Sequence, residues 1–425
     1  MKFYCKVSGL LDGISPVVAV SSHSAPKDFD GSNKINLESK NAELEASAFN
    51  SKVAIKNVIS DLTVTNLCYS CSSEGSVTVN SVDLQNVLIS FRKDDEVVVQ
   101  TKNANKGKEL VISRNDDQEE YQTLPCVASP IDVPKKATKF EREVVVDKST
   151  FIHGINRTFW AVGFEDSTPQ YLHWAFRVDT NKARFVCGTG ARFAALDIEG
   201  NNFISCTPIN PFTILFPKGH TETLKKIFGS FPGDEITIKA NNRQSSNFQI
   251  VIEAGSFEIL FVSMDSDIEF PDENKIIDMS VPNRFVTSLS EWSYVGSGIA
   301  ATYNEEIKKE RRPSNASVVR DDKNLVVKID GIMRASRKVP IIDSNYEKEN
   351  VDFVCSAPFL REISEHGGDQ GNVQIEIVGE DKAPIIVRYY ALDSVKDSIV
   401  LVNKNEASGL SERFTVFFAS LSKKI

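Results

Sequence analysis

Three stretches of alternating apolar and polar residues decide the fold: INLESKNAELEASAFNSKVAI (35–55), AFRVDTNKARFVCGTGARFAAL (175–196) and SVVRDDKNLVVKIDGIMRASRKV (317–339). In each stretch Val, Ile, Phe or Leu recurs at every second position on both sides of a polar turn. That period is typical of a β-hairpin with one buried face. The turn residues Asn41, Asn181 and Asn324 are 140 and 143 residues apart, so the sequence predicts one hairpin in three copies.

A short amphipathic helix recurs at a similar distance. The sequences SVDLQNVLISF, KGHTETLKKIFGSF and SAPFLREISEHG place Leu84, Leu224 and Leu360 in equivalent positions, 140 and 136 residues apart. A second helical stretch is expected before each hairpin, near residues 8–20, 148–162 and 284–298. These offsets predict three copies of helix, hairpin, helix and strands, in an α+β fold.

Proline-rich segments separate the predicted copies. Pro125, Pro130 and Pro134 interrupt the chain after the first copy, and the segment from Pro271 to Pro282 follows the second. The predicted domains are therefore residues 1–135, 136–281 and 282–425. Three unrelated α+β domains are the alternative interpretation.

Composition narrows the class of protein. The chain has 425 residues, with 49 Lys and Arg against 58 Asp and Glu, so its net charge is −9. This acidic total argues against a protein that coats nucleic acid with its whole surface, although it allows a local basic lining. No apolar run approaches the ~20 residues of a membrane span, and the first residues lack the apolar region of a signal peptide. Seven cysteines favour a reducing compartment, so we expect a soluble, cytoplasmic protein without a membrane partner.

Motifs for catalysis and metal binding are missing from the sequence. The five histidines show no ligand spacing such as HExxH, and neither a phosphate-binding glycine loop nor a GxSxG motif occurs. Cys68 and Cys71 form an isolated CxxC without a second pair or a nearby histidine, which favours an incidental spacing over a zinc or redox site. We expect no enzymatic activity, no metal and no cofactor.

Six short motifs, in order along the chain, resemble the bacterial DNA polymerase III β subunit, the sliding clamp. They are Met1-Lys2-Phe3 with Leu10-Leu11, Tyr121 to Pro125, Tyr171-Leu172 with Arg184 to Ala194, Phe270-Pro271-Asp272, Phe353 to Leu360, and Ala383 to Ile386. The chain departs from the family at Gly188-Thr189 and Ala191, and it is longer near residues 391–412. The resemblance covers essentially the whole chain and indicates a divergent member.

The resemblance implies a DNA-clamp fold of three repeated domains, each with two helices lining the inner face and antiparallel sheets outside. Two chains would close head to tail into a homodimeric ring around double-stranded DNA, without sequence readout. Such a ring is a processivity factor of DNA replication. It tethers a replicative DNA polymerase after a clamp loader has placed it on DNA. The alternative is a clamp-derived interaction scaffold that does not encircle DNA.

The implied ring requires basic residues on its helices in spite of the acidic total. The candidates for DNA contacts are Lys6, Arg92, Lys93, Lys148, Arg157, Lys218, Lys225, Lys226, Arg284 and Arg361. Each is about as readily explained as a solvated residue of an outer face. The pairs Arg92–Lys93 and Lys225–Lys226 are favoured because each lies on or just after the second helix of its copy.

The resemblance also implies an apolar pocket between the second and third domains that accepts a short hydrophobic peptide from partner proteins. Its wall would include Leu172, Gly190, Arg192, Phe193, Pro271, Ile276, Pro384, Val416 and Phe418. An apolar groove with one arginine and a glycine suits the anchoring of peptide side chains. Ordinary core packing is the alternative for Leu172, Ile276 and Val416. Tyr121 and Ile299 are the candidates for the dimer contact, and both could also be core residues.

Overall fold

The computed structural model divides the chain into two compact units, which are described one at a time. Unit 1 comprises Met1–Ile152, Ser205–Asn210 and Phe216–Ile268, and unit 2 comprises His153–Ile204, Pro211–Leu215 and Glu269–Ile425. The structure describes residues 1–22, 29, 31–105, 107–117, 119–163, 168–179, 182–189, 192–199, 204–207, 212–231, 233–241, 248–262, 268, 270, 272–279, 281, 283–302, 315–330, 335–345, 353–367, 371–377, 384–390, 403–405 and 410–419.

Unit 1 contains two β-sheets. The five-stranded sheet has the order β5 (Ser70–Ser73), β1 (Lys2–Lys6), β7 (Glu96–Ala104), β8 (Gly107–Arg114) and β9 (Tyr121–Pro125). The nine-stranded sheet has the order β14 (Ile204–Thr207), β10 (Arg142–Asp147), β16 (Glu235–Ala240), β17 (Ile250–Ala254), β18 (Phe257–Phe261), β4 (Val53–Ile59), β3 (Leu44–Phe49), β2 (Lys34–Ser39) and β6 (Gly75–Asn80).

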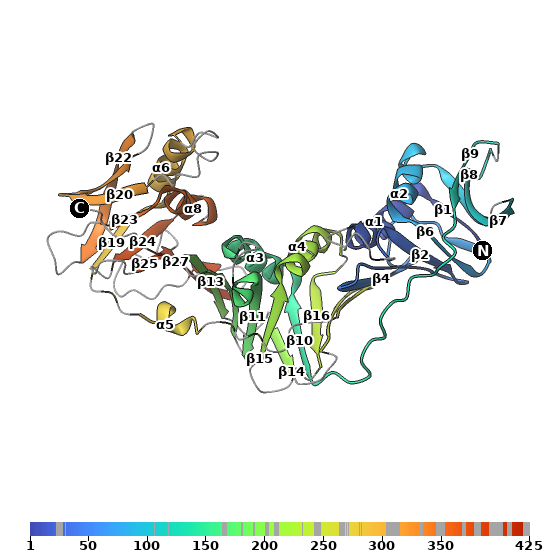
Figure 1. The fold of residues 1–425 in the computed structure, drawn as a ribbon, viewed down its shortest axis with the longest axis horizontal. Helices are drawn as coiled ribbons and strands as arrows, with labels where there is room; N and C mark the ends of the chain where they lie inside the picture. Colours follow the sequence, from blue (N-terminus) through green and yellow to red (C-terminus); the bar gives the residue numbers. More distant parts are fainter. Residues whose placement is uncertain are drawn as a thin grey trace. The chain divides into compact units, whose positions relative to one another are not determined.

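Three helices of unit 1 pack together: α1 (Val7–Ser22), α2 (Ser81–Ser90) and α4 (Lys218–Ile227), the last of which continues into the short η3 (Phe228–Ser230). Leu10, Ile14 and Val17 of α1 are fully buried, as expected for one apolar face of a helix. The side-chain oxygen of Asn80 caps α2 by accepting hydrogen bonds from the backbone N–H groups of Val82 and Asp83, at 3.0 and 3.1 Å. The buried face of α1 thus anchors these helices to β2, β3 and β4 (Figure 1).

The described residues of unit 2 form a sheet of 13 strands. Their order is β15 (Phe212–Pro217), β11 (His173–Asp179), β12 (Lys182–Gly188), β13 (Arg192–Glu199), β27 (Leu410–Ala419), β25 (Pro384–Tyr390), β24 (Asn372–Ile377), β19 (Asn283–Ser288), β22 (Ala335–Asn345), β21 (Asn324–Asp330), β20 (Asn315–Asp321) and β23 (Phe353–Ser356), and β26 (Asn403–Asn405) pairs with β27.

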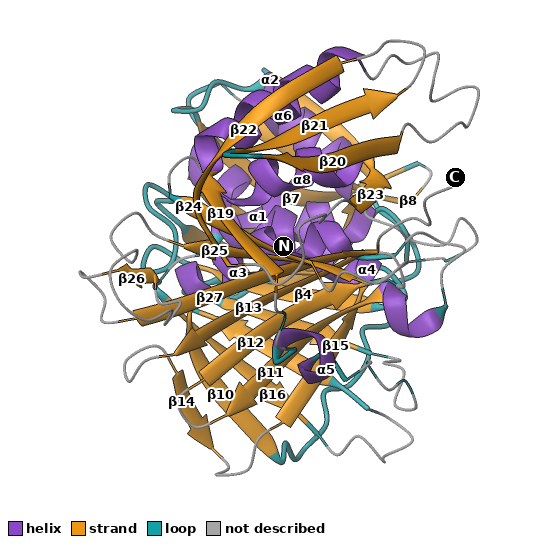
Figure 2. Cartoon of the chain, turned by 90° about the vertical axis from the view of Figure 1, so that its left-hand side faces the viewer, coloured by secondary structure: helices purple, strands orange, loops and turns teal. Residues whose placement is uncertain are grey.

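Helices pack on this sheet through large buried side chains. Besides α3 (Lys148–Thr158), which begins in unit 1, the helical elements are η1 (Phe159–Ala161), η2 (Pro169–Leu172), α5 (Asn274–Ile277), α6 (Leu289–Thr302) and α8 (Ala357–Gly367). Helices α6 and α8 contact each other (Figure 2), and Trp292 of α6 is fully buried and donates a hydrogen bond to Thr287. A Cβ atom on Gly154 of α3 would lie 2.5 Å from the Phe185 ring, so only glycine allows α3 to approach β12 this closely.

The order of elements repeats three times along the chain. Apart from the short strands β5, β14 and β26, the 3-10 helices and α5, each copy runs strand, helix, three-stranded meander, strand, helix and three strands: β1-α1-β2-β3-β4-β6-α2-β7-β8-β9, then β10-α3-β11-β12-β13-β15-α4-β16-β17-β18, then β19-α6-β20-β21-β22-β23-α8-β24-β25-β27. The three predicted hairpins are confirmed as the antiparallel pairs β2–β3, β11–β12 and β20–β21. The domain boundaries at residues 135 and 281 fall between copies and stay a prediction.

One predicted helix begins too early. Residues 284–298 were expected to be helical, but Arg284 to Ser288 belong to β19, and α6 begins at Leu289. The strand pairs with β22 and β24 on its two sides. Phe285 and Thr287 are buried at every second position, which is the period of a strand and not of a helix.

Two strand pairings carry a sheet from one copy to the next. In the first seam, within unit 1, β4 of copy one pairs with β18 of copy two, and Ala54 lies opposite Leu260. In the second seam, within unit 2, β13 of copy two pairs with β27 of copy three, and Phe193 lies opposite Phe417. Each seam therefore joins the last strand of a meander to the last strand of the following copy.

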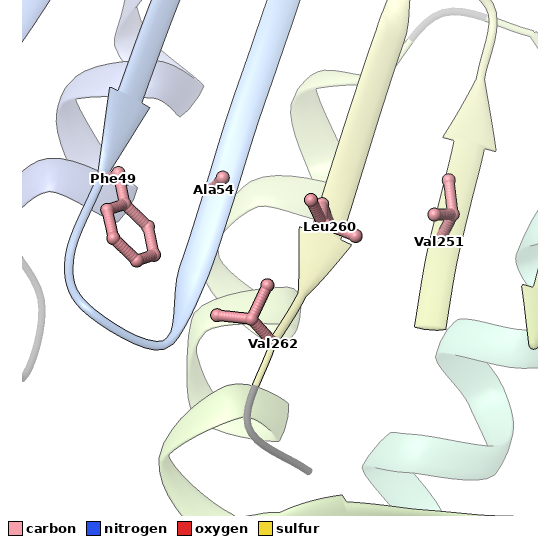
Figure 3. Packing of buried hydrophobic residues seen from close by; sticks show 5 residues of the cluster. All are labelled: Phe49, Ala54, Val251, Leu260 and Val262. Atoms are coloured by element: carbon pink, nitrogen blue, oxygen red, sulfur yellow. The ribbon is translucent and has the colours of Figure 1, made fainter. Parts of the chain in front are cut away.

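The first seam carries an apolar cluster of Phe49, Ala54, Val251, Leu260 and Val262 (Figure 3). Four partly buried residues pack against it: Phe29, Ile131, Val133 and Phe140. The last three belong to residues 126–141, the first connector, which links β9 to β10. Apolar burial thus holds the first connector on the seam.

We predict that Leu260→Ala lowers the free energy of unfolding by about 2–4 kcal/mol, because the side chain is 4% exposed and its removal leaves a cavity. The matched control is Leu62→Ala, at a side chain that is 98% exposed, where the change should stay within about 0.5 kcal/mol. Urea denaturation of both variants measures the difference, and equal effects would contradict the packing described here.

Candidate functional site

The residues predicted to line a peptide pocket meet at one end of the second seam. Arg192 and Phe193 begin β13, and the register places Arg192 opposite Phe418. Leu172 ends η2 directly before β11, whose first residue, His173, accepts a hydrogen bond from Cys187 of β12. The starts of β11 and β13 and the end of β12 therefore lie together.

Other predicted pocket residues are described only in part. Gly190 and Pro271 lie outside the described residues. Ile276, Pro384, Val416 and Phe418 are placed by their backbone alone, in α5, β25 and β27. The register adds a residue that the sequence mapping omitted, because Phe417, and neither Val416 nor Phe418, is the partner of Phe193.

Arg192 and Phe193 leave β13 on opposite faces, because they are consecutive residues of a strand. Phe193 shares its face with Asp197, four residues along β13, and is 5% exposed. The face of Arg192 is the helical one, where its guanidinium donates to Glu362 Oε1 of α8 at 2.8 Å and to the Val162 carbonyl at 3.4 Å. The apolar part of the candidate pocket therefore belongs to the face of Phe193.

An aromatic and charged cluster surrounds Arg192 on the helical face. Its guanidinium lies 5.7 Å from the centre of the Trp160 ring, within the range of a cation–π contact. Trp160 in turn stacks on His366 of α8, with ring centres 4.3 Å apart, and Arg157 donates to the His366 carbonyl. This cluster joins the end of α3 in copy two to the end of α8 in copy three.

Burial raises the pKa of the Glu362 carboxyl to about 7, and the nearby Arg192 lowers it only in part. The side chain is 14% exposed, and its second oxygen, Oε2, is buried without a hydrogen-bond partner. A carboxylate in such a site is penalised by the loss of hydration. Nothing in the sequence around Glu362 distinguishes it from the other acidic residues of α8, so it was missed as a site residue.

Ion pairs hold α5 on the face of the sheet that carries Phe193. Glu273, directly before α5, has a side chain that is 1% exposed and accepts from Arg177 of β11 at 2.8 Å. Arg184 of β12 binds both oxygens of Asp197 and reaches Glu273 at 3.5 Å. These contacts fix the N-terminal end of α5 to copy two.

The other end of α5 is fixed to copy three. Arg388 of β25 donates to the backbone carbonyl of Ile277 at 3.0 Å, which satisfies the helix end, and to Glu376 of β24 at 2.8 Å. Arg388 and Glu376 are both buried, so the pair is desolvated and directional. The helix α5 therefore bridges the two copies beside the second seam.

The candidate DNA contacts fall into three groups. Lys148, Arg157, Lys218, Lys225, Lys226 and Arg361 lie on helices, Arg92 and Lys93 follow α2, and Lys6 and Arg284 lie in strands β1 and β19. Lys225 and Lys226 are exposed in the last turn of α4, whereas Lys148 donates to the Phe231 carbonyl at 2.8 Å and Arg361 pairs with Glu365. Lys6 and Arg284 thus do not occupy the helical positions for which they were chosen.

The two candidate dimer residues lie in different units. Tyr121 is 57% exposed and begins β9, the end strand of the five-stranded sheet. Ile299 belongs to α6, where only its backbone is described. The dimer role of both residues stays a prediction.

The part of the chain that the structure describes shows no feature of a metal site or a membrane span. There, no group of three or more His, Cys, Asp or Glu side chains could hold a metal ion. Among those residues, no helix is long and apolar enough to cross a membrane. Cys68 and Cys71 are free cysteines in the structure.

Three repeats with sheets continued across seams define an α+β clamp architecture. The structure matches the DNA polymerase III subunit β of Pseudomonas aeruginosa with a TM-score of 0.76 and 14% identity, over 99% of this chain and 100% of that one. The DNA polymerase sliding clamp of Bacillus subtilis matches with a TM-score of 0.78 and 10% identity, over 100% and 99% of the two chains. A DNA polymerase III β chain of Streptococcus pneumoniae matches at 0.76 and 11%, over 99% and 100%.

These likenesses show that the chain has the fold of the bacterial DNA polymerase III β sliding clamp over its whole length. The predicted fold class and the resemblance read from the sequence are confirmed. No protein family model and no curated protein sequence matches the chain. Identities of 10 to 14% agree with a divergent sequence on a retained fold.

We predict that Glu362→Gln becomes progressively more stable than the wild-type protein between pH 4.5 and pH 7.5. The folded protein retains a proton on Glu362 up to a pKa of about 7, while the unfolded chain releases it near the ordinary value for Glu. Wild-type stability therefore falls as pH rises through this window, by up to about 3 kcal/mol at 1.36 kcal/mol per pKa unit.

Chemical denaturation of wild type and Glu362→Gln across this pH range measures the effect. Leu360→Ala on the same helix is the control, because it removes no ionisable group and its effect should not vary with pH. A constant difference between wild type and Glu362→Gln would show that the carboxyl is not buried as described.

Proposed function

We propose that the protein is a DNA sliding clamp that encircles double-stranded DNA as a head-to-tail homodimer and tethers a replicative DNA polymerase. The observation that carries the proposal is the fold itself, in which three copies of one order of strands and helices are joined by two equivalent seams. The solved structures with this fold include proteins described as DNA polymerase sliding clamps. Each protomer would be a non-catalytic accessory subunit, placed on cytoplasmic DNA by a clamp loader.

Ring closure follows from the unused strand edges. Within a chain, the last meander strand of copy one pairs with copy two, and that of copy two pairs with copy three. In β22, the last meander strand of copy three, Ile341–Asn345 pair with β19, whereas Ala335–Pro340 pair with β21 alone among the described strands. By the same rule, Ala335–Pro340 would pair with β9, the last strand of copy one, in a second chain. Two such contacts close a symmetric ring, and closure removes edges that would otherwise promote aggregation.

The proposed contact surface contains Tyr121 on β9. On the other chain, the contact would involve Ala335–Pro340 of β22, and α6 contains Ile299. Apolar side chains beside a new strand pair would add burial to its backbone hydrogen bonds. The candidate dimer residues Tyr121 and Ile299 therefore belong to copy one and copy three, the two copies that this closure would join.

Contacts with DNA would be few and weak. A ring held on DNA by topology needs no base readout and only modest attraction to phosphates. The pair Lys225–Lys226 supports this role because both side chains are exposed at the end of α4. The other helical candidates, together with Arg92 and Lys93, would supply a diffuse positive lining in an otherwise acidic protein.

The second seam is the proposed pocket for a short hydrophobic peptide of the polymerase, the loader or another partner. Its centre would be Phe193, with Phe417 opposite and α5 held beside it by Glu273 and Arg388. Leu172 lies at the same end of the sheet. Arg192, tied to Glu362 on the helical face, would support the wall from behind and not contact the apolar part of the peptide.

The alternative function is an interaction scaffold with the clamp fold that stays monomeric and does not encircle DNA. Sedimentation at micromolar concentration separates the two. A persistent 47.1-kDa species that no loader converts to a dimer would favour the scaffold.

We predict that protein loaded on a nicked circular plasmid dissociates when the circle is linearised, because a closed ring can slide off a free end. Gel filtration with labelled protein measures retention on both forms. Tyr121→Glu should weaken the dimer at least tenfold and reduce retention on the circle, while Leu62→Glu, at an exposed turn residue, serves as the control. Retention on linear DNA equal to that on the circle would refute a topological mechanism.

We predict that Phe193→Ala weakens the binding of a hydrophobic partner peptide at least tenfold, because it removes the aromatic centre of the pocket. Leu196→Ala is the matched control, since Leu196 is buried in the same strand but faces the helices. Fluorescence anisotropy of a labelled peptide measures both. Equal affinities of the two variants for the peptide would show that Phe193 is not the centre of the pocket. The same assay on Arg192→Ala tests the supporting role of Arg192.

A further inference from the structure

The two seams have the same geometry at one end. In the first seam Phe49 pairs with Ala54, and Ala54 with Leu260. In the second seam Gly188 pairs with Phe193, and Phe193 with Phe417. In both cases four residues separate the first pair, so Ala54 is the structural counterpart of Phe193.

The correspondence extends one strand further. Leu260 pairs with Val251 of β17, and Phe417 pairs with Ile386 of β25. The apolar cluster of the first seam, drawn in Figure 3, therefore occupies the position that the proposed peptide pocket occupies at the second seam.

At the first seam the chain itself supplies the apolar side chains that fill this position. Ile131, Val133 and Phe140 of the first connector pack on the cluster. Ile131 and Val133 are two positions apart, and the Val133 N–H donates to the Ile131 carbonyl at 3.1 Å, which closes a γ-turn between them. Phe29 completes the cover, with its ring edge-on to that of Phe49 at 5.3 Å.

Polar side chains of the sheet hold the backbone of the same connector. Gln249 donates from Nε2 to the Lys135 carbonyl at 3.1 Å and accepts from the Ala137 N–H at 2.8 Å. Lys136 pairs with Glu253 at 3.1 Å and with Glu258. Proteins bind peptides in a similar way, with apolar side chains in a groove and the main chain held by a few polar groups.

We propose that the first seam is a peptide-binding groove of the same kind as the pocket at the second seam, and that residues 131–140 fill it in cis. This inference rests on the proposed function, because it takes the second seam as the open groove. Each chain then offers one groove to its partners, and a dimeric ring offers two. The occupant that fits the first groove is a short segment with two aliphatic residues two positions apart, followed by an aromatic residue.

The double variant Ile131→Ser/Val133→Ser tests the proposal by removing the aliphatic side chains of the occupant. The probe is a fluorescein-labelled synthetic peptide with the sequence of residues 129–141. The double variant should bind it at least tenfold more tightly than the wild-type protein, whose groove is filled. Adding Leu260→Asp to the double variant should abolish this gain, because it places a charge in the groove.

A double variant that is folded by circular dichroism and binds the peptide no better than wild type overturns the proposal. If the double variant does not fold, Phe140→Ser removes one contact only and is measured in the same way, with the same two outcomes. Failure of the proposed function gives a different result. In that case the wild-type protein does not bind the partner peptide, or binds it no better than Phe193→Ala does. Binding of the connector peptide to the double variant does not depend on Phe193.

Discussion

The fold depends on one constraint, which is that the last strand of each meander must not be left as an unpaired edge. An open edge exposes a row of backbone N–H and C=O groups that water or another chain must satisfy. Strands β4 and β13 meet the constraint by pairing with the next copy. The seams also explain why the compact units do not coincide with the sequence repeats. Copy two is divided between them because its meander pairs with copy three and its last strands pair with copy one.

The sequence predicts what is local and fails where contacts are remote. The hairpins were predictable because their alternation lies within some twenty residues, as in β11 and β12. The seams were not, since Ala54 and Leu260 are 206 residues apart and Phe193 and Phe417 are 224 apart. No pattern in either strand specifies its partner. The strand β19 was missed for a different reason, because it is short and runs directly into α6. The helical spacing of the apolar residues in α6 continues back into β19 and hides the alternation that is typical of a strand.

The candidate site could also be predicted only in part from the sequence. Motif matching placed Arg192 and Phe193 in the correct strand, but it could not separate them onto the two faces that strand geometry dictates. It also could not give the register of β27, in which Phe417 lies opposite Phe193, because a shift of one residue exchanges the faces. No pattern in the sequence identified Glu362 as part of the site. Its raised pKa arises from burial between elements that meet only in the folded chain.

The two connectors are held at their seams in different ways, and this difference has a functional consequence. The first connector packs apolar side chains directly on the seam and adds polar contacts at Gln249 and Lys136, so an apolar peptide could replace the part that covers the seam. The second connector, residues 262–282 between β18 and β19, carries α5, which is held by the buried carboxylate of Glu273 and by Arg388. An apolar peptide cannot replace these groups, because displacing them would leave buried charges without partners. A hydrophobic ligand at the second seam would therefore add to the connector without competing with it, as a site for exchangeable partners requires.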